Sequence, residues 1–157
     1  MQIVLITIGK NKHLYLDKGL QEYIKRMQNY VSFKIDYIPD VKKNNKTPES
    51  YIKSQESKLI LKKIINTDYV ILLDNHGDML SSQQFANQLQ KWLLSSKKRI
   101  IFIIGGAYGF ASNVYDRADQ LISLSKMTFS HQMIRLFFIE QLYRSYTILN
   151  NEPYHNA

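Results

Sequence analysis

The chain has 157 residues, of which 45% are hydrophobic and 22% are charged, and it contains no cysteine. This length and composition predict one globular domain over residues 1–157, and the missing cysteines exclude disulfide frameworks and thiolate metal sites. Lysine and arginine number 21 against 13 acidic residues, and the resulting formal net charge of +8 favours a polyanionic partner, nucleic acid before acidic membrane.

The sequence also predicts where the protein acts and what it does not bind. Its four histidines are scattered without ligand spacing, so we expect no metal site. No apolar run approaches the ~18 residues that a membrane span needs, and the N-terminus lacks the pattern of a signal peptide. We therefore expect a cytoplasmic protein without a membrane segment.

Strand-like and helix-like segments alternate through the first half of the chain. The predicted elements are strands at 2–8 and 32–38 and helices at 14–26 and 48–65. Thr47 followed by Pro48 predicts a helix start, with a hydroxyl cap and proline at the first helical position. A polar, basic loop without periodicity precedes this start.

The alternation continues to the end of the chain. The predicted elements are strands at 69–73, 99–104 and 120–124 and helices at 81–94, 112–118 and 131–149. Ser81 and Gln84 have the spacing of a capping box, and Ser130 is the predicted cap of the final helix. Such alternation predicts an α/β fold with a mainly parallel sheet flanked by helices.

The fourth strand ends in a glycine-rich turn. An unbroken apolar run over 100–104 indicates a strand buried on both faces, and Gly105, Gly106 and Gly109 follow it at once. Ligands bind beyond the carboxyl ends of parallel strands, so this turn favours a cofactor loop over an ordinary strand-to-helix turn. It is not a dinucleotide fingerprint, which would follow the first strand with a different glycine spacing.

The last predicted helix is apolar around nearly its whole circumference. A helix of this kind is buried all round. A terminal helix in a small domain covers its own sheet with one face, so the other face predicts a second subunit related by a two-fold axis. The alternative is a helix sunk into the core of its own chain.

Several segments together resemble the RlmH family of SPOUT methyltransferases, and the match spans the whole chain in motif order. They are ITIGK at 6–10, LLD at 72–74, IIGGAYG at 103–109, LISLSKMTF at 121–129, HQMIR at 131–135 and PYH at 153–155. The resemblance implies an S-adenosylmethionine-dependent methyltransferase that modifies N3 of a pseudouridine in large-subunit (23S) ribosomal RNA, with the assembled ribosome as expected substrate. It also implies a C-terminal trefoil knot and a homodimer.

The resemblance also implies particular site residues. The cofactor contacts carry over to Leu73, Gly105, Leu124, Ser125, Lys126, Met127, Thr128 and Phe129. The chain departs from the family pattern at Asp78, where relatives usually have lysine, at Ser130, usually proline, and after His155, where a basic residue commonly follows. These departures concern the grip on RNA rather than the cofactor pocket.

Removal of the N3 proton requires a base, and we assign candidate roles accordingly. His131 and the tail residue His155 are candidates for accepting the proton. Arg135 could hold a phosphate or stabilise charge on a uracil oxygen, and Arg144 and Tyr154 are candidate substrate contacts, the tyrosine by stacking. The structural alternatives are that His131 only caps the cofactor loop and that the arginines pair with Glu140 or Asp116.

Two other functional classes stay open on the sequence. One is a non-catalytic RNA-binding α/β protein in which the glycine turn is only a turn. The other is a nucleotide-dependent enzyme on a flavodoxin-like sheet, against which the position of the glycine loop argues. The sequence leaves undecided which base takes the proton, whether uridine replaces pseudouridine, and whether free RNA is a substrate.

Overall fold

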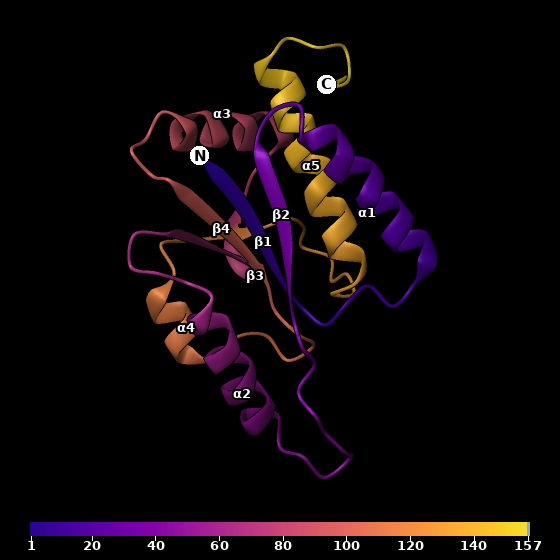
Figure 1. The fold of residues 1–157 in the computed structure, drawn as a ribbon, viewed down its shortest axis with the longest axis vertical. Coiled ribbons are helices and arrows are strands. Elements are labelled where there is room, and N and C mark those ends of the chain that lie inside the picture. The colour runs from indigo at the N-terminus through magenta and orange to yellow at the C-terminus, as the bar shows by residue number, and fades with distance from the viewer. Residues whose placement is uncertain (157) are drawn as a thin grey trace.

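Five parallel strands form one sheet in the order β2-β1-β4-β3-β5 (Figure 1). The computed structural model describes residues 1–156; Ala157, the last residue of the predicted domain, lies outside the described residues. The strands are β1 (Gln2–Ile8), β2 (Ser32–Ile38), β3 (Tyr69–Met79), β4 (Arg99–Ile104) and β5 (Gln120–Ser123). The predicted α/β class with a parallel sheet is confirmed.

Helices cover both faces of the sheet (Figure 1). One face carries α1 (Leu14–Met27), α3 (Ser82–Leu93) and α5 (Met133–Leu149), and the other carries α2 (Glu49–Lys62) and α4 (Ser112–Arg117). Alternate residues of β4 enter the two cores: Phe102 packs on the first side and Ile101 on the second, both fully buried. The apolar run is therefore a strand covered on both faces, as predicted.

The capping box of α3 forms as predicted, whereas the predicted start of α2 is wrong by one residue. Ser81 Oγ accepts a hydrogen bond from the Gln84 amide at 3.1 Å, and Gln84 Oε1 accepts one from the Ser81 amide at 2.8 Å. Thr47 Oγ1 instead accepts the Asn44 amide at 3.0 Å, so its hydroxyl serves a preceding turn. Pro48 consequently takes the cap position, without a side-chain cap, and the helix begins at Glu49.

β3 runs to Met79, six residues beyond the predicted end at Leu73. The strand is irregular: both Leu73 and Asp78 pair with Ile122 of β5, so the intervening residues form a bulge. Gly77 lies on the β5 backbone, where an added Cβ would stand 2.5 Å from the Ile122 nitrogen. A side chain here would clash with main chain, which explains the glycine.

α5 begins at Met133, two residues later than predicted, although Ser130 Oγ accepts a hydrogen bond from the Met133 amide at 3.1 Å. The helix packs between α1 and α3, and one chain suffices to bury Phe138, Ile139 and Leu142 fully. Burial in its own core thus accounts for much of its apolar surface. The second subunit and the trefoil knot stay predictions. No helix within residues 1–156 has the length and apolarity to cross a membrane.

Candidate cofactor and substrate site

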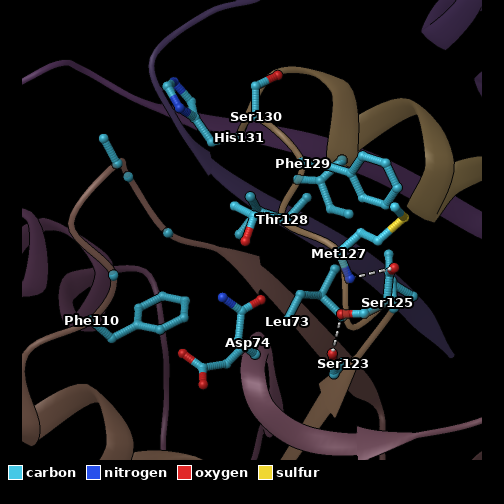
Figure 2. A pocket seen from close by; sticks show the side chains of 18 residues that line it. Leu73, Asp74, Phe110, Ser123, Ser125, Met127, Thr128, Phe129, Ser130 and His131 are labelled. Atoms are coloured by element: carbon cyan, nitrogen blue, oxygen red, sulfur yellow. Dashed lines mark hydrogen bonds between the residues drawn. The ribbon is translucent and has the colours of Figure 1, made fainter.

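A cavity of about 410 Å³ opens at the carboxyl ends of β3, β4 and β5. Three loops and the start of α5 form its walls (Figure 2). The lining residues are Leu73, Asp74, Asn75, Ile104, Gly105, Gly106, Ala107, Gly109, Phe110, Ser123, Leu124, Ser125, Met127, Thr128, Phe129, Ser130, His131 and Ile134. Its volume is in the range of small-molecule and cofactor sites.

The glycine loop is a tight turn on one wall. The Gly109 amide donates to the Gly106 carbonyl at 3.2 Å, and Gly109 has a φ of 79°, a conformation that glycine adopts without strain. Gly105 lies against the Phe110 ring, whose nearest atom would be 3.1 Å from an added Cβ. The loop thereby presents main-chain groups to the cavity.

The segment after β5 forms the opposite wall and is held by its own serines. Ser123 Oγ donates to the Ser125 carbonyl at 3.0 Å, and Ser125 Oγ accepts a hydrogen bond from the Met127 amide at 2.9 Å (Figure 2). These bonds turn the chain back across the strand ends. The segment then continues through Phe129 and His131 into α5.

The structure brings together most of the predicted cofactor residues. Those that line the cavity are Leu73, Gly105, Leu124, Ser125, Met127, Thr128 and Phe129. Lys126 is exposed and is not among the lining residues. His131 joins the same wall, whereas Arg135, Arg144, Tyr154 and His155 lie elsewhere.

Asp74 is a pocket residue that the sequence reasoning did not single out. Its carboxylate accepts hydrogen bonds from the Tyr115 hydroxyl at 2.5 Å and from the His76 amide at 2.9 Å. Burial acts to raise the pKa of Asp74, but the bonds from Tyr115 and His76 outweigh burial and lower it. The group is therefore ionised at neutral pH. Its place directly after the apolar part of β3 is a signal that could have identified it.

The imidazole of His131 is uncharged at neutral pH. Burial lowers the pKa of its imidazole from the ordinary 6.5, and the nearby charges of Arg135, Lys12 and Lys43 lower it further, against an opposing effect of Asp40. A neutral imidazole can accept a proton, and this one stands at the cavity wall.

Arg135 is fully buried and serves the backbone. Its Nη2 donates to the Ile8 carbonyl at 2.6 Å, and its Nη1 donates to the Gly9 carbonyl at 2.9 Å and to Asn11 Oδ1 at 3.0 Å. Its Nε donates to the His131 carbonyl at 3.2 Å. This guanidinium has no exposed surface for a phosphate or a base, so we propose no direct contact between Arg135 and RNA. The structural alternative fits, but the partners of Arg135 are these carbonyls and not Glu140 or Asp116.

The C-terminal tail folds back on α5. Tyr154 donates to Glu140 Oε1 at 2.9 Å, its ring lies 4.8 Å from the Arg144 guanidinium carbon, and Arg144 Nη1 is 3.2 Å from His155 Nδ1. Arg144 also pairs with Glu140 at 2.6 Å, as the structural alternative anticipated. Glu140 is seven residues and Arg144 eleven residues beyond Met133, about 16 Å along the helix for Arg144, so this cluster lies on the middle and second half of α5 whereas the cavity lies at its start.

Comparison with known proteins gives this arrangement a family. The model of the family described as "predicted SPOUT methyltransferase" matches residues 1–155. The ribosomal RNA large subunit methyltransferase H of Christiangramia forsetii is 51% identical over 156 residues, which are 99% of both chains. The chain belongs to the RlmH family of SPOUT methyltransferases.

Other RlmH family members are nearly as similar. The proteins of the same name from Flavobacterium johnsoniae and Parabacteroides distasonis are each 49% identical over 156 residues and 99% of both chains. A solved structure of a probable methylase family protein from Haemophilus influenzae superposes with a TM-score of 0.55 at 12% identity. That match covers 95% of this chain and 66% of that one, and it supports the fold alone.

We predict that Arg135→Ala unfolds this RlmH family chain more easily, because it leaves the buried carbonyls of Ile8 and Gly9 without a donor. The expected loss in unfolding free energy is about 3 kcal/mol or more, measured by denaturant titration at fixed protein concentration. Lys25→Ala, at an exposed position of α1, is the matched control and should change the value by less than about 0.5 kcal/mol. Equal stability of the two variants would contradict the structural role of Arg135.

Proposed function

We propose that this protein transfers the methyl group of S-adenosylmethionine to N3 of a pseudouridine in large-subunit (23S) ribosomal RNA. Family membership supports the reaction, and the printed name of the relatives supports the ribosomal substrate. Residues 1–157 act in this proposal as one SPOUT methyltransferase domain, in the cytoplasm, where ribosomes are found. The net charge of +8 suits an RNA partner.

The charge inside the cavity is the observation that carries the choice of cofactor. Among the described residues that line it, Asp74 is the one acidic side chain, lysine and arginine are absent, and His131 is neutral. A protein with a net charge of +8 thus keeps its cationic side chains out of this cavity. Phosphate-bearing cofactors such as NAD or FMN need cationic or amide-rich cradles, whereas a sulfonium donor favours an ionised carboxylate.

The residues present fit S-adenosylmethionine, which supplies an activated methyl group on a positively charged sulfur. Apolar side chains of Leu124, Phe129 and Ile134 offer a surface for a flat adenine, and the main chain around Gly105 offers hydrogen-bonding groups for its edge. Ser125 holds the turn that shapes this wall. Asp74 contributes the negative charge.

The uracil-type N3 must lose its proton before it can attack a methyl carbon. We assign this step to His131, because its imidazole stands at the cavity wall and is neutral near pH 7, with one ring nitrogen free to accept a proton. The Nε–carbonyl bond from Arg135 fixes the backbone of His131 and so the position of the base. The target base of the RNA must also be held in place, and the candidates for this contact are Tyr154 and His155 of the C-terminal tail.

The position of the tail supports a homodimer with shared sites. Tyr154 and His155 are not among the residues that line the cavity of their own chain, and they are bound to Glu140 and Arg144 on the middle and second half of α5. A two-fold partner could bring its tail to this cavity. Exposed apolar residues beside the cavity favour such an interface: Phe129 and Phe137 are about 40% exposed, with ring centres 4.9 Å apart, and Met127 is 73% exposed.

We expect S-adenosylmethionine to bind the purified protein, and NAD and FMN to bind much more weakly or not at all. Isothermal calorimetry with the three ligands measures this directly. Absence of S-adenosylmethionine binding would favour the non-catalytic RNA-binding protein. A preference for NAD or FMN would favour the nucleotide-dependent enzyme, and either result would overturn the proposal.

His131→Ala is expected to lower the rate of methyl transfer by about 10²–10⁴-fold while S-adenosylmethionine still binds. In the unaltered enzyme the rate should fall on the acid side only below pH 6.5, because the lowered pKa of His131 keeps the base neutral above that value. The cellular readout is mass spectrometry of nucleosides from the ribosomal RNA of a deletion strain. The strain is complemented with the gene for the unaltered enzyme or for His131→Ala. An undiminished rate would remove His131 from the chemistry.

Shared sites predict complementation between two inactive chains. One chain carries Gly105→Leu, which blocks the cofactor pocket, and the other carries Tyr154→Ala with His155→Ala. A heterodimer purified through two different tags should recover about half of the normal activity, because one site combines an intact pocket with an intact tail. Each homodimer is the control. An inactive heterodimer made from two stable, dimeric variants would contradict the sharing of sites.

A further inference from the structure

Glu56 of α2 is a buried acidic residue that the proposed reaction does not use. The residue is 5% exposed, and its carboxylate oxygens keep some access to solvent, since they are not among the fully buried side-chain atoms without a partner in residues 1–156. A carboxylate that is largely withdrawn from water loses part of its hydration, which disfavours its charged form. Its presence at this position therefore calls for a function that outweighs its cost in stability.

The carboxylate of Glu56 lies directly behind the glycine loop. A Cβ added to Gly106 would stand 2.5 Å from Glu56 Oε2 and 2.7 Å from Oε1. Positive φ angles occur at Gly9 and Gly109 but not at Gly106, so backbone conformation does not require this glycine. The close approach of Glu56 does. Because Gly106 also lines the cavity, no side chain separates the carboxylate from the cavity wall.

The surroundings of Glu56 leave its charge only partly compensated. Burial raises the pKa of Glu56; the ammonium group of Lys43 lowers it, and the carboxylate of Asp40 raises it. Lys43 itself lies over the Tyr108 ring of the glycine loop, with 5.3 Å between its nitrogen and the ring centre. Glu56 thus adds negative potential to the glycine wall, while Asp74 provides it at the end of β3.

We propose that Glu56, acting across Gly106, makes the cavity prefer the positively charged methyl donor over its neutral product. In the transfer, the bond from N3 to the methyl carbon forms while the sulfur–methyl bond breaks, and the bonding electrons return to sulfur. The sulfonium becomes a thioether and its positive charge disappears. A carboxylate near the cavity stabilises the first species and not the second, which promotes release of S-adenosylhomocysteine. This inference rests on the proposed function.

The test compares two ligands that differ by one methyl group and one charge. Calorimetry gives the Kd values of S-adenosylmethionine and S-adenosylhomocysteine for the unaltered protein and for Glu56→Gln. The amide should weaken S-adenosylmethionine binding about three- to tenfold and leave S-adenosylhomocysteine within about twofold. Glu49→Gln is the matched control, since it makes the same charge change at an exposed position of the same helix and should alter neither Kd.

Two further measurements separate this effect from a structural one. Glu56→Gln should unfold at the same or a higher temperature than the unaltered protein, because it removes a largely buried charge. Glu56→Asp keeps the charge and should retain most of the preference for the donor. Equal weakening of both ligands, or no change in either, would overturn the inference. Failure of the unaltered protein to bind S-adenosylmethionine would instead overturn the proposed function, and this inference with it.

Discussion

The buried Arg135 guanidinium is the interaction on which the arrangement of this protein depends. It joins the start of the last helix to the end of the first strand through the carbonyls of Ile8 and Gly9, and it also holds the carbonyl of His131. Gln132 adds a second tie, because its side chain bonds the backbone of Lys10 and Lys12. These contacts fix where the cofactor loop ends and where the candidate base begins. Without them, the segment from Leu124 to His131 would have no rigid support on one side.

The second constraint is electrostatic. The chain has a net charge of +8, yet the described residues that line its cavity include one carboxylate and no lysine or arginine. The surface and the cavity therefore suit opposite partners, a polyanion outside and a cation inside. Glu56 extends this separation, because it adds a negative charge behind a wall made only of backbone. A binding site for a sulfonium within an RNA-binding protein requires such a division, since long-range attraction for phosphate would otherwise weaken cation binding.

The sequence predicted best those features that depend on few neighbouring residues. The capping box of Ser81 and Gln84 joins positions three residues apart, and both of its bonds form. Thr47 does not cap α2, because its hydroxyl accepts the amide of Asn44, three residues earlier, in a competing turn. Asp74 and Arg135 illustrate the limit: their decisive bonds span 41 and 127 positions, to Tyr115 and Ile8. No local pattern encodes such contacts, and a lone arginine in a family motif is equally compatible with a structural or a catalytic role.

By itself the sequence determined the parallel α/β class and the glycine loop at the end of β4, because strand periodicity and glycine chemistry are local; the role of the segment after β5 came from its resemblance to the RlmH family. Only the tertiary structure decided which side chains face the cavity. It turned Arg135 inward, placed the tail residues Tyr154 and His155 against Glu140 and Arg144 of α5 and set Glu56 against Gly106. These outcomes depend on how helices pack on the two faces of the sheet, and that packing joins residues whose separation along the chain leaves no periodic trace.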